Sequence, residues 1–179
     1  MPQGPEAGTG KEGAVSDRII AARYDFPLIE LAPLAADRAA TVEELVAGLP
    51  NTNPEITSAH FGGVLAAPHR EDTSRLLLAK PLHDRQHLAR EQVVRLLQEA
   101  GLEPADLPQL ALLKAHTDEL WEAGVRFVGA LGARSVWAAP DGAYAVYLIC
   151  NPADRGFHLH WLESEWGGPV WFLVRRKSR

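Results

Sequence analysis

Short apolar runs alternate with turn-forming residues along residues 134–179. The turns are expected at residues 140–142, 151–156 and 167–169, which are rich in proline, glycine, asparagine and aspartate. Apolar runs separated in this way indicate consecutive antiparallel strands joined by hairpins. We therefore predict a four-stranded antiparallel meander over this part of the chain.

The side chains of each predicted strand can be sorted by face, because they alternate along a strand. The second strand has two apolar faces, as expected of a central strand covered on both sides: Tyr144, Val146, Leu148 and Cys150 share one, and Ala143, Ala145, Tyr147 and Ile149 share the other. The third strand is divided between Phe157, Leu159 and Trp161 on one face and His158, His160 and Leu162 on the other. The sequence does not say what covers the second face. The candidates are an N-terminal hairpin, a second subunit and a ligand.

Upstream of this meander, two shorter apolar runs at residues 56–67 and 74–80 predict an N-terminal hairpin, with a bulge at Gly62–Gly63. Thr41 and Glu44 have the spacing of a capping box, which predicts a short helix to about Ala47. Residues 16–34 are interpreted as a short helix followed by an extended segment, because two prolines limit any helix there.

Two central helices are predicted from apolar residues at helical spacing. The first covers residues 84–100 with Asp84 as its N-cap and Gly101 as its stop, and the second covers residues 108–131. Gly124 and Gly129 weaken the last turns of the second helix, so a break there is compatible with the sequence. Both helices are expected on one face of the sheet. The predicted fold class is α+β.

Length and composition add limits to this outline. The chain has 179 residues, 46% hydrophobic and 23% charged, which fits one domain over residues 16–179 after a disordered tail at residues 1–15. The single cysteine, Cys150, excludes an internal disulfide. No apolar run is long enough to span a membrane and no secretory signal is seen, so we expect a cytoplasmic protein without membrane partners.

His158 and His160 are the strongest candidates for metal binding. Two histidines separated by one residue on a strand point to the same face, about 6.5–7 Å apart, and can hold one metal ion. A catalytic site needs a third ligand, and the candidates are His60, His116, Asp118, Glu119 and Glu163. Two hydrogen-bonded or solvated strand histidines are the simpler explanation of the pattern, so no cofactor is expected beyond this weak case for a divalent metal.

A second hypothesis comes from charge. The chain carries a net charge of −5, but residues 134–179 contain six basic and four acidic residues. Arginines beside aromatic side chains on a sheet are typical of single-stranded nucleic-acid binding. The candidates are Trp137, Tyr147, Trp161, Trp171 and Phe172, with Arg134, Arg155, Arg175, Arg176, Lys177 and Arg179. Aromatics on strands also serve as core residues, which is the simpler interpretation.

Other possible sites have plainer explanations. Residues 83–87 hold two histidines, but Asp84 there is explained by helix capping and the HExxH pattern is missing. His116 and Glu119 lie on one helical side, as an acid–base pair or as a solvated face. Cys150 shares a strand face with Val146 and Leu148, which indicates a core residue and not a nucleophile.

No complete catalytic set is present, so the sequence favours a non-enzymatic binding or regulatory protein. It would act through a face of the C-terminal sheet toward a protein partner or a second copy of itself. The expected binding residues are Trp161, Trp171, Arg134, Arg155, Arg175 and Arg176. A small metal-assisted enzyme using His158 and His160 is the first alternative, and a nucleic-acid-binding protein is the second.

Overall fold

The computed structural model describes residues 15–19, 26–34, 38–68, 73 and 75–177. Its strands are β1 (Val15–Ile19), β2 (Leu28–Leu31), β3 (Ala40–Thr41), β4 (Val64–Leu65), β5 (Leu76–Ala79), β6 (His87–Leu88), β7 (Leu102–Pro104), β8 (Phe127–Gly129), β9 (Val136–Ala139), β10 (Gly142–Ile149), β11 (Gly156–Trp161), β12 (Trp166–Gly167) and β13 (Val170–Arg176). The helices are α1 (Val42–Val46), α2 (Ser58–Phe61), α4 (Arg90–Glu99), α5 (Leu107–Leu112) and α6 (Thr117–Glu122), with 3-10 turns η1 (Leu113–His116) and η2 (Ala133–Ser135). The chain combines helices with a large, mostly antiparallel sheet, as predicted for an α+β protein.

The main sheet has the strand order β1-β2-β5-β13-β8-β10-β11, with β7 beside β13 and β9 beside β10. All its pairs are antiparallel except β13 with β8, which is parallel. Two small ribbons, β3–β4 and β6–β12, stand apart from it. The consecutive hairpins β9–β10 and β10–β11 confirm the first three strands of the predicted meander. The prediction was wrong for the last strand, because β13 does not pair with β11 and lies between β5 and β8.

The predicted N-terminal hairpin is also wrong. Residues 58–61 form the helix α2, β4 pairs with β3, and β5 pairs with β2 and β13. All four residues of β5 are buried, so this strand needs sheet neighbours on both edges and cover on both faces. A two-stranded hairpin cannot provide that environment.

The N-terminal part differs from its prediction in one further respect. Val15–Ile19 is the strand β1, paired with β2, and not a helix. The extended segment predicted after it is confirmed by β2. Residues 1–14, most of the predicted tail, lie outside the described residues, as do residues 20–25.

The helices are shorter than the periodicity indicated. α4 begins at Arg90, after β6 has paired with β12, and Asp84 forms an ion pair with Lys80 (2.7 Å) in place of capping the helix. The second predicted helix is divided into α5, η1 and α6, and it ends near Gly124, whose φ of 84° closes the helix in the left-handed region. The segment 127–129 becomes the strand β8 instead. The capping box of Thr41 and Glu44 is confirmed.

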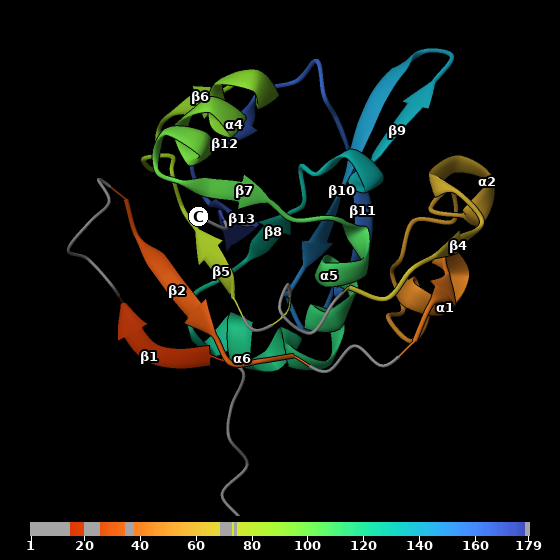
Figure 1. Ribbon diagram of the computed structural model, residues 1–179, viewed down its shortest axis with the longest axis horizontal. Helices are drawn as coiled ribbons and strands as arrows, with labels where there is room; N and C mark the ends of the chain where they lie inside the picture. Colours follow the sequence, from red (N-terminus) through yellow and green to blue (C-terminus); the bar gives the residue numbers. More distant parts are fainter. Residues whose placement is uncertain (1–14, 20–25, 35–37, 69–72, 74, 178–179) are drawn as a thin grey trace, which may run out of the picture.

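The two faces of the sheet are covered by different elements. On the first face, α1, α2, α5, η1 and α6 pack against residues that include Val146, Leu148 and Leu173. On the second face, α4 and the β6–β12 ribbon pack against Ala145, Phe172 and other residues of that side. In Figure 1, α4, β6 and β12 lie together at one end of the view, and α1, α2 and β4 lie together at the opposite end. The two predicted central helices therefore lie on opposite faces of the sheet, so the prediction that both cover one face was wrong. The chain itself covers the second face.

Candidate functional site

Four aromatic side chains lie at the outer end of the first face, and three of them, His60, Trp137 and Tyr144, are in ring contact. Tyr144 of β10 is in register with Trp137 of β9 and with Trp161 of β11, so the three side chains share one face. Trp137 stacks on Tyr144 with ring centroids 5.6 Å apart, and His60 of α2 stacks on the other side of the row, 3.8 Å from Trp137 and nearly parallel to it. We call His60, Trp137, Tyr144 and Trp161 the aromatic row.

Trp161 is the exposed large apolar side chain of the aromatic row, with 42% of its surface accessible. Its indole lies across the neighbouring strand on Gly142, where a Cβ atom would overlap Nε1 of the indole. Gly142 also has a φ of 151°, a conformation that L side chains rarely adopt. A glycine at this position therefore leaves room for the Nε1 edge of the indole against the backbone of β10.

His60 is held in place by backbone contacts of the loop before α2. Its Nδ1 lies 2.6 Å from the carbonyl oxygen of Glu55, and a carbonyl can only accept, so Nδ1 carries the proton. At the start of α2, Ser58 donates from both its amide and its hydroxyl to the carboxylate of Glu43, which ties α2 to α1. The histidine end of the aromatic row is thereby fixed to the helical layer.

The surroundings of the aromatic row are acidic. The hydroxyl of Tyr144 donates to Asp141 at 3.0 Å, and this bond raises the pKa of Tyr144, with smaller contributions from desolvation and from the negative charges of Asp141 and Glu55. The segments that build the outer end, residues 51–63, 137–145 and 159–166, contain Glu55, Asp141, Glu163 and Glu165 and no lysine or arginine. This end of the sheet is therefore an aromatic surface with a negative rim.

The arginines proposed from the sequence do not join this surface. Each is paired with its own carboxylate on a different element: Arg134 with Asp106 (3.1 Å), Arg155 with Asp118 (2.7 Å), Arg175 with Glu103 (3.0 Å) and Arg176 with Glu30 (2.8 Å). Trp171 lies on β13, partly buried against the core of the first face. Of the six residues proposed for binding, only Trp161 belongs to the aromatic row.

His158 and His160 lie together on the second face, as the alternation of β11 predicted. The ring of Tyr147 is 5.7 Å from that of His158 and 6.4 Å from that of His160, and His160 lies 4.0 Å from the ring of Trp166. Burial lowers the pKa of His160, although hydrogen bonds to the backbone of Ser164 and Glu165 oppose the shift. Both Nε2 atoms are buried without a hydrogen-bond partner.

The structure brings no third ligand to this pair. His60 lies on the first face, and η1 and α6, which carry His116, Asp118 and Glu119, also pack there. Within the described residues, no group of three histidine, cysteine, aspartate or glutamate side chains could hold a metal ion. His116 lies 3.3 Å from Glu119 instead, on one side of the η1–α6 junction.

Cys150 is fully buried at the end of β10, as predicted. Burial raises the pKa of its thiol to about 12, against a smaller opposite effect of Arg155. The side chain is therefore a neutral thiol, which packs as a core residue and lacks the thiolate that a nucleophile needs.

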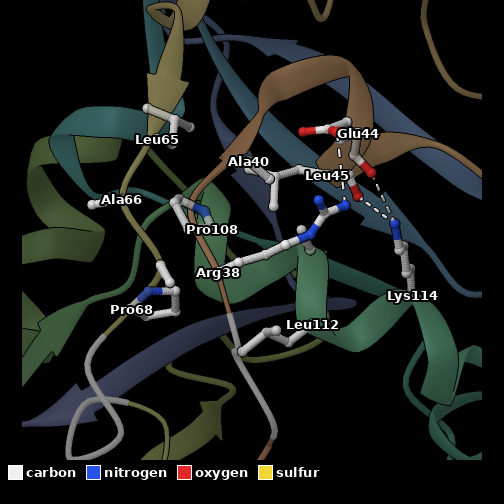
Figure 2. A pocket seen from close by; sticks show the side chains of 12 residues that line it. Arg38, Ala40, Glu44, Leu45, Leu65, Ala66, Pro68, Pro108, Leu112 and Lys114 are labelled. Atoms are coloured by element: carbon white, nitrogen blue, oxygen red, sulfur yellow. Dashed lines mark hydrogen bonds and ion pairs between the residues drawn. The ribbon is translucent and has the colours of Figure 1, made fainter.

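A separate cleft of about 260 Å³ lies between the β3–β4 ribbon, α1 and α5. Figure 2 shows its largely apolar wall and the charged groups at its rim. These groups are already engaged: Arg38 faces Glu44 at 3.7 Å, and Lys114 donates to the carbonyl oxygens of Glu44, Leu45 and Ala47. The ammonium of Lys114 thus closes the end of α1, and burial lowers its pKa. Three separate segments, residues 38–45, 65–68 and 108–114, form this cleft, so no local pattern could have predicted it.

The aromatic row was only partly visible in the sequence. Strand alternation placed Trp161 with Leu159 and Tyr144 with Val146, on faces that the structure confirms. The contribution of His60 was missed, because residues 58–61 were interpreted as a strand. Gly142 lies two residues before Tyr144, the register partner of Trp161, and is the signal that could have located the exposed tryptophan.

Comparison with known proteins finds no matching family model, no matching curated protein and no matching solved structure. Among the described residues, no helix is both long enough and apolar enough to cross a membrane.

Proposed function

We propose that the protein is a non-enzymatic binding protein that holds its partner against the aromatic row, with Trp161 as the anchor. One observation carries the proposal: a tryptophan with 42% of its surface exposed has the Nε1 edge of its indole against Gly142, on the same sheet face as Tyr144 and Trp137. Tryptophan is enriched among the residues that dominate binding energies at protein interfaces. A ring that is already held in position loses little conformational freedom when a partner covers it.

The rim of the aromatic row argues against nucleic acid as the partner. Phosphate binding depends on lysine and arginine side chains, and the three segments around the row contain none. Four of the arginines that favoured this alternative, Arg134, Arg155, Arg175 and Arg176, are each paired with a carboxylate elsewhere, and Arg179 lies outside the described residues. A duplex or a single strand would meet Asp141, Glu55 and Glu163 before it met the rings.

The proposal is tested with three classes of probe against ¹⁵N-labelled protein: an arginine-rich peptide, single-stranded DNA and a neutral oligosaccharide. The readout is the set of indole N–H signals, with that of Trp161 assigned from the Trp161→Phe variant. We expect one class to shift the Trp161 signal, and Trp161→Ala to weaken that binding by at least about tenfold, or about 1.4 kcal/mol.

Val64→Ala is the matched control, because Val64 is, among the residues that the structure describes, the other large exposed apolar side chain, 68% accessible, and lies on β4 outside the aromatic row. This variant should bind like the wild type. If no probe shifts the Trp161 signal, or if Trp161→Ala binds as tightly as Val64→Ala, the proposal is wrong.

The unpartnered Nε2 atoms of His158 and His160 favour a second candidate, a metal-assisted enzyme. Two neutral imidazoles on one strand would supply two ligands, and water or substrate would have to complete the coordination. Metal analysis of the purified protein, compared with a His158→Ala/His160→Ala variant, tests it. Equal metal content in the two proteins would exclude this candidate.

A further inference from the structure

β11 is an edge strand of the main sheet, because among the described strands it pairs only with β10. Alternate residues of such a strand direct both their N–H and C=O groups away from the sheet. Phe157 is one of them: its carbonyl accepts from the amide of Asn53 at 2.8 Å, and its amide donates to the hydroxyl of Thr52. The loop at residues 51–53 therefore protects the first half of this edge.

The second half of the edge is open. The same alternation makes Leu159 and Trp161 the next residues whose backbone groups point outward, whereas Leu162 donates back to Ala143 of β10. The carbonyl of Trp161 accepts from Ser164 in the following turn. The N–H and C=O of Leu159 and the N–H of Trp161 have no partner within the described part of the chain. The next residue of the protecting loop is Pro54, which has no amide hydrogen to donate to Leu159.

The open groups lie beside the aromatic row and its acidic rim. An unpaired edge is a template for a further strand, and natural proteins usually block such edges. A second copy of this chain would bring the same carboxylates, Asp141 and Glu163, against themselves, and like charges across an interface are unfavourable. A segment with positive side chains instead meets opposite charges and an indole face that attracts cations.

We propose that β11 accepts an extended, arginine- or lysine-bearing segment of a partner polypeptide as an additional strand. Its backbone pairs with Leu159 and Trp161, and one of its cationic side chains lies on the indole of Trp161. This mode combines backbone hydrogen bonds for affinity with alternate side chains for specificity. The inference rests on the proposed function and specifies its partner.

The test uses the full-length protein and an eight-residue peptide of alternating arginine and valine. Two further peptides carry N-methyl groups on all arginines or on all valines, and a glutamate–valine peptide is the charge control. The N–H groups of alternate residues point to opposite edges of a strand, so one methylated peptide should lose binding by about tenfold or more and the other should retain it. The glutamate peptide should not bind.

Amide hydrogen exchange supplies an independent readout. In the free protein, the amides of Leu159 and Trp161 should exchange quickly, whereas those of His158 and His160, bonded to β10, should be protected. Binding of the arginine–valine peptide should slow the exchange of the Leu159 and Trp161 amides. The double variant Asp141→Asn/Glu163→Gln should weaken the binding of this peptide. The control variant Glu91→Gln/Glu99→Gln removes the same charge from the exposed side of α4 and should leave the binding unchanged.

The outcomes separate the two proposals. If the two methylated peptides bind alike, whether tightly or weakly, or if the exchange of Leu159 and Trp161 does not slow, strand addition is wrong. In that case the proposed function still stands provided that Trp161→Ala abolishes binding of the parent peptide. If neither Trp161→Ala nor the rim variant changes its binding, both proposals fail.

Discussion

Replacing Gly142 with alanine tests how Trp161 is held. The added methyl group has two costs. It places an L side chain at a φ of 151°, and it overlaps Nε1 of the indole. The indole must then lift away from β10, or the backbone must move.

The two costs can be sized separately. A strained φ of this kind costs about 1–2 kcal/mol. Trp161 is 42% exposed, so more than half of its surface is covered. A tryptophan buries up to about 250 Å² when fully covered, and half of that area at 25 cal/mol per Å² corresponds to about 3 kcal/mol. Partial displacement of the ring loses about half of this. We therefore expect Gly142→Ala to lower the free energy of unfolding by about 2–4 kcal/mol.

The assay is a double-mutant cycle by urea unfolding of the wild type, Gly142→Ala, Trp161→Ala and the double variant. With the indole removed, the methyl group has space, so Gly142→Ala should then cost only the strain of about 1–2 kcal/mol. A coupling energy of about 1–2 kcal/mol is expected. Gly124→Ala is the matched control: its φ is 84°, and nothing lies within 4 Å of the added atom.

The control should lower stability by the strain alone, and by the same amount with or without Trp161. Additive costs for Gly142→Ala and Trp161→Ala, within about 0.5 kcal/mol, would refute the placement of the indole on Gly142. An additive result would also show that Gly142 does not hold the indole in place, and the proposed function would lose its argument that Trp161 is preorganised for binding.

Three further predictions concern groups outside the aromatic row. Cys150 should react with thiol reagents at about pH 8 only after unfolding, because its thiol is buried and its pKa is raised to about 12; rapid labelling of the folded protein would contradict its burial. The pKa of His160 is lowered from 6.5 in the folded protein, so on acidification the unfolded chain takes up the proton first. The contribution of His160 to the free energy of unfolding should therefore be complete above about pH 6.5. It should decline as the pH falls toward the lower pKa of the folded state. Urea unfolding at several pH values should show the advantage of the wild type over His160→Gln narrowing on acidification, and a constant difference would refute the shift. Lys114→Met keeps the apolar stem but leaves the carbonyls of α1 without their cation, so it should cost about 1–3 kcal/mol in the same assay, and an unchanged midpoint would show that water replaces the ammonium without loss.

Features that depend on neighbours in sequence were predictable. The capping box needs only Thr41 and Glu44, three residues apart, and it is formed as expected. The faces of β10 and β11 follow from alternation alone, and so does the burial of Cys150. Each of these is decided by local geometry, which the order of residues specifies directly.

Strand partners were not predictable, because they are chosen by burial far along the chain. β5 looks like half of a hairpin, yet its partner Leu173 on β13 lies almost a hundred positions beyond Leu78. The helical periodicity of residues 84–89 was outweighed by the pairing of Leu88 with Trp166. Tertiary context overrides such weak local preferences.

The candidate site shows the same division. Alternation assigned Trp161 and Tyr144 to their faces, but the row exists because β9 and β11 flank β10 in register and α2 adds His60. The arginines looked like a group because they are close in sequence. In space, four different carboxylates neutralise them one by one.

The position of β13 has a consequence for biosynthesis. This strand joins β5 and β7 to β8, and it is translated after all of them. Until residues 170–176 leave the ribosome, β5 has only β2 beside it and β8 has only β10, so each strand keeps one unpaired edge. Folding of the main sheet must therefore wait for the end of this segment. A chain that ends before Val170 would have unpaired strand edges that can aggregate, and it would be a substrate for chaperones and proteases.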